Sequence, residues 1–322
     1  TVNATASGNG MITDGNAATT NIASTNLDAT AATGIDLDTD TDSITASVTG
    51  TGAIDIDETD AVTLTSVTTA DGSITIDAGG LLTATDVRSL TDSASNDISL
   101  VTTTGDVSLE TVDAGSSGGL TVTSATGSIT DVTGSAISAD NTTLAANAGD
   151  ITLGDDATDT VNFGSLTFSA ISGDVDITED SATQLVGSNT ADGLDLVSAG
   201  AITDDTGATL AVASLARLTG ANITLGDASA TVNFGSVQFA GSAVTITESS
   251  AMTIAATSSA TAGLLLDAAD DISLFGPLTV TGDATLVAGT TSGGVLINGT
   301  MNVSANVVID AADEIRNEAP IS

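Results

Sequence analysis

The sequence predicts an all-β protein in which residues 1–322 form one continuous parallel β-helix, or β-solenoid, of roughly 15 coils. Short segments alternate apolar residues with Thr, Ser or Asp, which is the pattern of a strand with one buried face. Turns rich in Gly and Asp separate these segments, and no long window shows the helical period. A repeat of about 20 residues with two or three short strands is the size of one solenoid coil.

Expected strands follow one another along the chain. Clear examples are residues 43–48, 62–67, 73–76, 97–101, 106–109, 120–123, 150–153, 175–178, 194–197, 244–247, 278–281 and 307–310. From Leu64 to Leu120 a strand–turn–strand phrase recurs about every 20 residues, and after Leu166 the longer intervals indicate longer loops. An array of β-sandwiches is the alternative. It would show domains of about 100 residues joined by linkers, and the composition has no such break.

Aliphatic side chains have to fill the interior, because 41% of residues are hydrophobic but only 2% are aromatic. Four of the five Phe lie in a phrase that occurs twice, at residues 151–168 and 223–239. The doubled phrase indicates a duplication about three coils long within a stack of shorter repeats. We interpret its aromatic residues as a stack in the core rather than the wall of a ligand pocket: Phe163, Phe168, Phe234 and Phe239.

The charge balance is strongly acidic. The chain has 42 Asp and Glu, three basic residues and a net charge of −39, and the basic residues are Arg88, Arg217 and Arg316. A nucleic-acid-binding protein needs a basic surface, so that class is excluded. Attraction to an anionic membrane surface is excluded for the same reason. The acidic residues indicate either a well-solvated surface or the binding of divalent cations between coils.

The sequence contains no Cys and no His. A zinc site built from those ligands and a Cys–His catalytic pair are therefore excluded. The first residues lack the basic and apolar regions of a secretory signal peptide, and no run of about 18 apolar residues predicts a membrane span. A mature or excised segment of a secreted chain would look like this, and so would a cytoplasmic protein, although the absence of His and Lys would be odd there.

Several short phrases recur with small changes: GDITL at residues 149–153, ANITL at 221–225, DGSITI at 71–76 and TGSIT at 126–130. They resemble the repeats of filamentous haemagglutinin-like large exoproteins, which are bacterial surface adhesins. The resemblance implies a right-handed parallel β-helix, an extracellular location at the bacterial cell surface and an adhesive role. The secretion-domain motifs expected near the start of such exoproteins are not evident, which fits an internal segment of a longer protein.

The densest acidic run predicts a candidate Ca²⁺ site. Alternate residues of a strand share one face, and stacked coils would bring the run close to the next acidic strand. Carboxylate oxygens suit Ca²⁺. The loop Gly and closing Glu of an EF-hand and the nonapeptide of calcium β-rolls are both missing, and a solvated acidic face is the alternative. The candidate ligands are Asp36, Asp38, Asp40, Asp42, Asp55 and Asp57.

Paired carboxylates raise the question of glycoside hydrolysis. The pairs are Asp155–Asp156, Glu179–Asp180, Asp204–Asp205 and Asp270–Asp271. Sugar sites usually carry aromatic platforms and lyases of acidic sugars need basic residues, whereas this chain has no Trp, Tyr or Lys. We therefore expect no enzyme, no catalytic residues and no cofactor other than Ca²⁺.

The sequence thus predicts an extracellular structural or adhesive rod, either an adhesin stalk or a subunit of a filament or surface layer. The first alternative is a module that orders or polymerises with Ca²⁺, and a polysaccharide-processing enzyme ranks last. Neither end looks like a cap, so the expected partners are other copies of the chain, adjoining segments of a longer one, and glycans of a host or cell surface. No nucleic-acid partner and no membrane insertion are expected.

Overall fold

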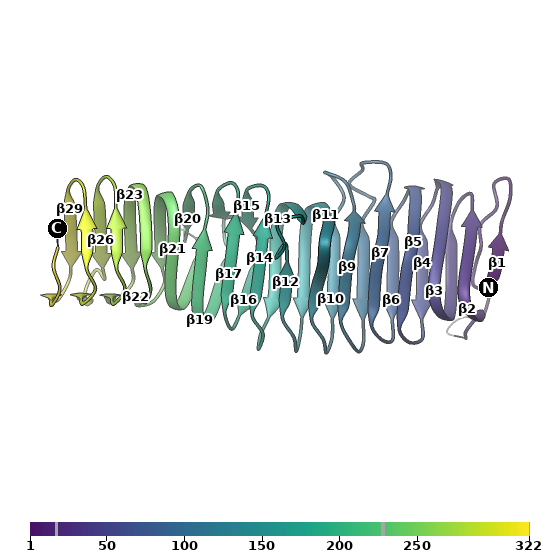
Figure 1. Ribbon diagram of the computed structural model, residues 1–322, viewed down its shortest axis with the longest axis horizontal. Coiled ribbons are helices and arrows are strands. Elements are labelled where there is room, and N and C mark those ends of the chain that lie inside the picture. The colour runs from purple at the N-terminus through teal and green to yellow at the C-terminus, as the bar shows by residue number, and fades with distance from the viewer. Residues whose placement is uncertain (17–18, 227–228, 322) are drawn as a thin grey trace. The chain divides into compact units, whose positions relative to one another are not determined.

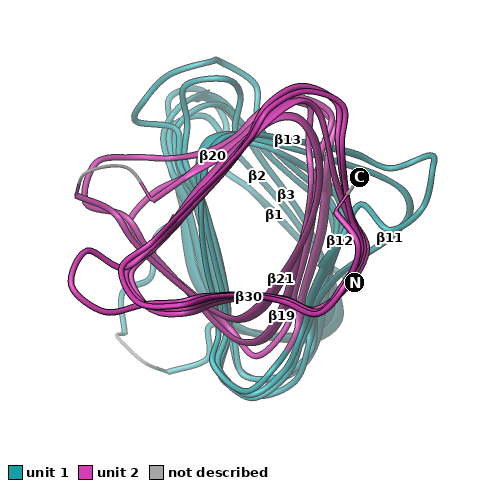
Figure 2. Cartoon of the chain, turned by 90° about the vertical axis from the view of Figure 1, so that its left-hand side faces the viewer, with its two compact units in different colours: residues 1–173 teal, residues 174–322 magenta. Residues whose placement is uncertain are grey.

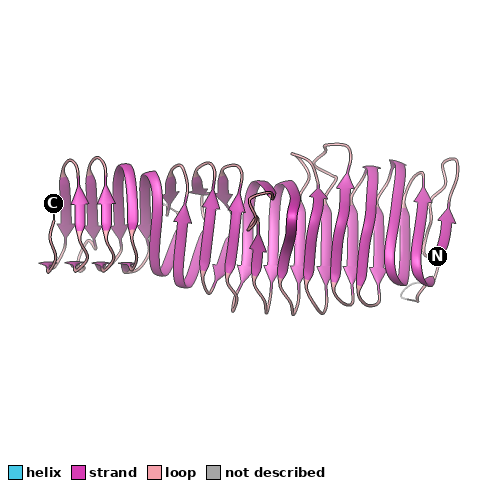
Figure 3. Cartoon of the chain, in the orientation of Figure 1, coloured by secondary structure: helices cyan, strands magenta, loops and turns pink. Residues whose placement is uncertain are grey.

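The computed structural model describes residues 1–322 except 17–18, 227–228 and 322. The described residues form strands, turns and loops without a helix (Figure 3), so none of them provides a helix that could cross a membrane. Parallel strands stack as a β-solenoid of about 15 turns, which confirms the predicted fold. The chain divides into two compact units, residues 1–173 and 174–322, each of which winds through successive coils (Figures 1 and 2).

The described residues of unit 1 form the strands β1 (Val2–Thr5), β2 (Ile22–Ala31), β3 (Ile35–Thr51), β4 (Ile54–Glu58), β5 (Val62–Asp71), β6 (Ile74–Ala78), β7 (Leu82–Ser89), β8 (Ile98–Thr102), β9 (Val107–Asp113), β10 (Leu120–Ser124), β11 (Ile129–Ala146), β12 (Ile151–Leu153) and β13 (Thr160–Ala170).

Unit 2 begins with β14 (Val175–Glu179), β15 (Thr183–Leu185), β16 (Ser188–Ala191), β17 (Leu194–Ser198), β18 (Ile202–Asp204), β19 (Thr209–Thr219), β20 (Ile223–Leu225), β21 (Thr231–Glu248) and β22 (Met252–Ile254). It continues with β23 (Ser258–Ala268), β24 (Ile272–Leu274), β25 (Leu278–Val280), β26 (Ala284–Ala288), β27 (Val295–Ile297), β28 (Met301–Val303), β29 (Val307–Ala311) and β30 (Ile315–Asn317).

The core of unit 1 is built from columns of side chains that repeat at the same place in successive coils. One parallel ladder runs through β3, β4, β6, β8, β10, the end of β11 and the end of β13. Because alternate residues of a strand point to the same face, each inward residue stacks on its counterpart one coil away. One such column, at most 5% exposed, consists of Leu37, Ile56, Ile76, Leu100, Val122, Leu144 and Phe168.

Unit 2 follows the same rule. A ladder from β20 through β21, β23 and β26 aligns buried aliphatic residues in register. Its column consists of Leu225, Ile246, Leu266 and Leu286. The predicted burial of the four Phe in the doubled phrase is confirmed, because none is more than 6% exposed. They belong to the core of their units.

Glycine permits the close stacking of turns. A side chain on Gly72 would place its Cβ 2.1 Å from the carbonyl oxygen of Gly52, and one on Gly52 would place its Cβ 2.0 Å from that of Thr33. Both separations are far below a van der Waals contact, so these turns exclude any other residue. The Gly-rich spacing of the sequence therefore reflects the distance between coils, which is about 4.8 Å.

Truncating a core column should be costly. Leu64 is fully buried in β5, and Leu64→Ala is expected to lower the free energy of unfolding by about 3 kcal/mol because it leaves a cavity. The neighbouring Thr65 is exposed, so Thr65→Ala should change the free energy of unfolding by less than about 0.5 kcal/mol. Denaturant unfolding followed by circular dichroism compares the two variants, and equal losses would contradict the assigned orientation of β5.

Candidate functional site

The predicted calcium ligands lie on the outer face of β3 and β4. In β3, acidic side chains alternate with the buried side chains of Ile35, Leu37 and Thr39. The parallel register then pairs acidic residues of the two strands, Asp36 with Asp55 and Asp38 with Asp57. The structure therefore brings four of the six predicted residues together in two pairs.

The remaining two predicted residues lie farther along β3. Asp40 is in register with Ala23 of β2, and its carboxylate lies near those of Glu58 and Asp60. Asp42 is exposed beyond these groups and just before the paired residue Ser43. The six residues are thus distributed along one outer face rather than gathered around one point.

The pairing continues into the next coil, where Asp57 is in register with Asp77 of β6. We call Asp36, Asp38, Asp55, Asp57 and Asp77 the acidic row. Burial raises the pKa of Asp38, Asp55 and Asp77, and the charges of neighbouring row members raise it further. Like charges opposite each other on neighbouring strands are destabilising, so the row carries an electrostatic cost that a bound cation would reduce.

A first carboxylate cluster joins Asp40, Glu58 and Asp60, with one oxygen of each within 4.8 Å of the others. Glu58 is only 4% exposed. Its carboxylate accepts hydrogen bonds from the Thr39 hydroxyl (2.7 Å), the Thr41 amide (3.0 Å) and the Thr59 amide (3.0 Å). Because its oxygens already have partners, Glu58 serves the corner of the coil, and Asp40 and Asp60 are the exposed members.

A second cluster joins Asp131, Asp155 and Asp159, again with one oxygen of each within 4.8 Å of the others. It forms where the register of β11 against β9 shifts between Asp131 and Ala136. Asp159 is 8% exposed, and its Oδ1 accepts the amides of Gly134 (2.7 Å) and Ser135 (3.0 Å). These two hydrogen bonds fix the Asp159 carboxylate against Gly134 and Ser135, which belong to the segment where the register shifts.

Asp131 differs from Asp159 in that part of its carboxylate is unsatisfied. Its Oδ2 accepts hydrogen bonds from the Ser135 hydroxyl (2.7 Å) and the Gly154 amide (2.8 Å), whereas its Oδ1 is buried without a hydrogen-bond partner. Burial raises the pKa of Asp131, and the charges of Asp159 and Asp155 add to the effect, although those two hydrogen bonds oppose it. An additional positive charge at this point would satisfy the free oxygen.

Sequence reasoning missed several members of these groups and considered one more, Asp155, only as part of a carboxylate pair; the missed members are Glu58, Asp60, Asp77, Asp131 and Asp159. The coil period could have found two of them, because Asp77 lies about one coil after Asp57 and Asp131 lies about one coil before Asp155. Glu58 could have been found from the alternation in β4, which places its side chain on the same inward face as Ile54 and Ile56. Asp159 had no comparable signal, because its position depends on an irregular turn.

Many other aspartates bridge successive coils. A carboxylate just before one strand accepts the amide of the residue at the same place in the next coil, at distances of 2.7–3.0 Å. This arrangement explains the recurring Asp of the turns and gives these residues a structural role. The pairs are Asp97–Gly119, Asp106–Ser128, Asp174–Gly193, Asp271–Gly294 and Asp283–Asn306.

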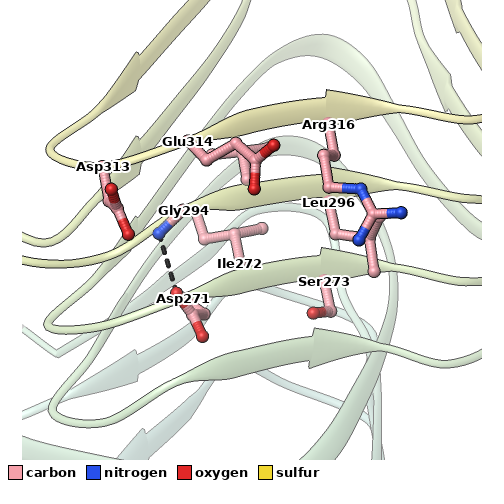
Figure 4. A pocket seen from close by; sticks show the side chains of 9 residues that line it. Asp271, Ile272, Ser273, Gly294, Leu296, Asp313, Glu314 and Arg316 are labelled. Atoms are coloured by element: carbon pink, nitrogen blue, oxygen red, sulfur yellow. Dashed lines mark hydrogen bonds between the residues drawn. The ribbon is translucent and has the colours of Figure 1, made fainter.

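A surface depression of about 280 Å³ on unit 2 is lined by residues that include Asp271, Gly294, Glu314 and Arg316 (Figure 4). The Gly294 amide donates to Asp271 Oδ1 at 2.7 Å, and the Arg316 guanidinium pairs with Glu318. Gly294 stands between Asp271 and Glu314 of the flanking coils and has no side chain. The depression therefore reflects the missing side chain of Gly294 in the column that also contains Asp271 and Glu314.

These features define a repeat β-helix protein of strongly acidic composition. Residues 95–167 and 172–238 match a family model described as repeats of unknown function (DUF5649). No curated protein and no solved structure matches the chain. The family match supports the repeat architecture, and its description assigns no activity.

Neutralising the middle of the acidic row should stabilise the protein. Asp57→Asn is expected to raise the free energy of unfolding at pH 7 by about 0.5 kcal/mol, because Asp57 stands between Asp38 and Asp77. The raised pKa values mean that repulsion grows as the pH rises, so the gain should disappear as the pH falls below 3.8, the ordinary value. Melting temperatures of the variant and wild type at pH 3 to 8 provide the measurement.

Asp28→Asn is the matched control for this experiment, because Asp28 is exposed on β2 and is in register with Asn3 and Thr45 rather than with a carboxylate. It should not reproduce the gain. An equal gain in both variants would show that overall charge, rather than the row, is responsible.

Proposed function

We propose that the chain is an extracellular structural or adhesive rod, as in an adhesin stalk or a subunit of a filament or surface layer. The observation that carries the proposal is the regular parallel ladder within each unit, in which successive coils are joined by backbone hydrogen bonds and by columns of buried side chains. Such stacking resists bending and extension, because many hydrogen bonds have to break together.

The composition of the outer faces suits the same role. Outward positions carry mainly Thr, Ser and Asp, and the net charge of −39 opposes non-specific aggregation. The resemblance to exoprotein repeats adds the expected location at a bacterial cell surface. Glycans of a host or cell surface remain the proposed ligands of the loops and outer faces.

The last coil of unit 2 offers a surface for a structural partner. Ile315 continues an inward column through Ile272 and Val295, which are at most 1% exposed, yet Ile315 itself is 52% exposed. Among the described residues, β29 and β30 pair with another strand on one side only, and an apolar column open at that edge favours the addition of a further parallel coil. We propose that another copy, or an adjoining segment of a longer chain, supplies it.

End-to-end association is the test of this role. Electron microscopy and light scattering of the purified chain should show rods that join into longer assemblies. Ile315→Lys should reduce association at least severalfold, because it places a charge in the apolar column. Leu90→Lys, at a residue 64% exposed in a turn of unit 1, is the control and should leave association unchanged. A compact, strictly monomeric wild type would contradict the proposal.

We propose calcium binding as a second candidate function, favoured by the cluster of Asp131, Asp155 and Asp159. Its three carboxylates converge from neighbouring coils, and Asp131 Oδ1 is buried without a partner. Oxygen ligands of this kind suit Ca²⁺. The acidic row and the Asp40–Glu58–Asp60 cluster would attract further cations to the outer face of unit 1.

Calcium should then stabilise the folded chain. At a free concentration about 100 times the Kd, one site adds about 2.7 kcal/mol to the free energy of unfolding. Asp155→Asn should remove that increment, whereas Glu110→Gln, at an exposed residue of β9, should retain it. Calorimetric melting with Ca²⁺ and with chelator measures the difference. Identical melting in both solutions would count against calcium binding. Full stabilisation of Asp155→Asn by Ca²⁺ would show that the site lies elsewhere.

A further inference from the structure

Three coils bury a glutamate at a corner where neighbouring coils have small residues. Glu58, Glu179 and Glu248 are at most 4% exposed, and each is the last residue of its strand. Glu248 is in register with Ala268, which in turn is in register with Ala288. Each glutamate therefore introduces an ionisable group into a position that is otherwise apolar or small.

The first two glutamates have hydrogen-bond donors for both carboxylate oxygens. Glu58 accepts bonds from the Thr39 and Thr41 hydroxyls and from backbone amides. Glu179 accepts bonds from the hydroxyls of Ser181, at 2.7 Å to Oε1, and of Thr183 to Oε2. Donors of this kind stabilise an ionised carboxylate inside a protein.

Glu248 lacks such a complete set. Its Oε1 accepts the Phe234 amide at 2.9 Å and the Ser250 hydroxyl at 3.2 Å, whereas its Oε2 is buried without a hydrogen-bond partner. The side chain is 1% exposed. An ionised carboxylate with an unsatisfied buried oxygen is costly, and a neutral carboxylic acid at the same place costs much less.

The surroundings of Glu248 provide no compensating charge among the described residues. Its own strand contributes Phe234, the following turn contributes Ser250, and β23 contributes Ala268 in register. The acidic group of β23 nearest in register is Asp267, which pairs with Thr247 on the outward phase. Asp227, two positions after the end of β20 in the sequence, lies outside the described residues. Burial raises the pKa of Glu248 to about 7, and the bonds from Phe234 and Ser250 oppose this rise only in part.

The contact made by Glu248 lies at a weak point of the ladder. Phe234 near the start of β21 and Glu248 at its end meet at one corner of a coil, where the Ser249 amide also donates to the Val232 carbonyl at 2.9 Å. In the described residues the next strand, β22, is in register with β21 only at Val237 and Ile254. The Phe234–Glu248 bond therefore supplies a connection that strand pairing does not.

We propose that Glu248 is a proton-controlled latch: as a neutral acid it stays buried and keeps the β21 corner closed, and as a carboxylate its unsatisfied Oε2 draws the side chain toward water and loosens that corner. The latch is closed in mildly acidic solution and is released as the solution becomes slightly alkaline. Since the folded protein holds this proton more tightly than the unfolded chain, the stabilisation is lost progressively between pH 4.5, the ordinary value for Glu, and about 7. The inference is independent of the proposed structural role.

Glu248→Gln tests the latch, because the amide has nearly the same shape and cannot ionise. Wild type and variant should unfold similarly at pH 4. The unfolding equilibrium constant of the wild type should then exceed that of the variant by an increasing factor, reaching on the order of a hundredfold at pH 8. Glu58→Gln is the contrasting control and should be less stable than wild type at pH 8, because it replaces an acceptor with a donor.

A second measurement keeps the proposal open to refutation if the variant does not fold. Carbon-13 NMR of the glutamate side chains in the wild-type protein should show one carboxyl group titrating near pH 7, and Glu248 can be assigned by selective labelling. A midpoint near 4.5 for Glu248 would overturn the proposal. Parallel pH profiles of wild type and Glu248→Gln would do the same.

Discussion

The structure depends on the parallel register between successive coils. Each inward residue stacks on the residue at the same place one coil away, so the side chains have to be compatible in columns rather than in isolated pairs. Aliphatic residues meet this condition easily, as the column through Leu37 and Ile56 shows. Aspartates stacked on an outer face repel one another. The same register that builds the core therefore also produces the acidic row.

Most of the fold could be predicted from the sequence, because alternation and coil length are local patterns. Stacking one coil on the next predicted that the run from Asp36 to Asp42 would lie near Asp55 and Asp57, and the register pairs Asp36 with Asp55 and Asp38 with Asp57. The cluster around Asp131 could not be predicted in the same way, since it forms where the ladder shifts its register. Glu248 was overlooked for another reason: it continues the inward phase of Val244 and Ile246, but acidic residues are ordinarily assumed to face water.

The acidic composition has several physical roles in this chain. Aspartates that precede strands accept amides of the next coil, as in the Asp271–Gly294 pair. Buried glutamates such as Glu58 accept amides at coil corners, and the acidic row remains as concentrated negative charge on one outer face. A large net charge is therefore weak evidence for any one ligand until the carboxylates with internal partners are set apart from those without.

The register also determines which changes of length the architecture tolerates. One extra residue within a strand would turn every following inward side chain outward. Extra residues in a turn, such as residues 90–97 between β7 and β8, leave the ladder on both sides intact. Evolution can accordingly vary such a protein along two independent axes, by adding or removing whole coils and by lengthening individual loops. Homologues are therefore expected to differ in overall length by multiples of a coil while their binding properties diverge in the loops.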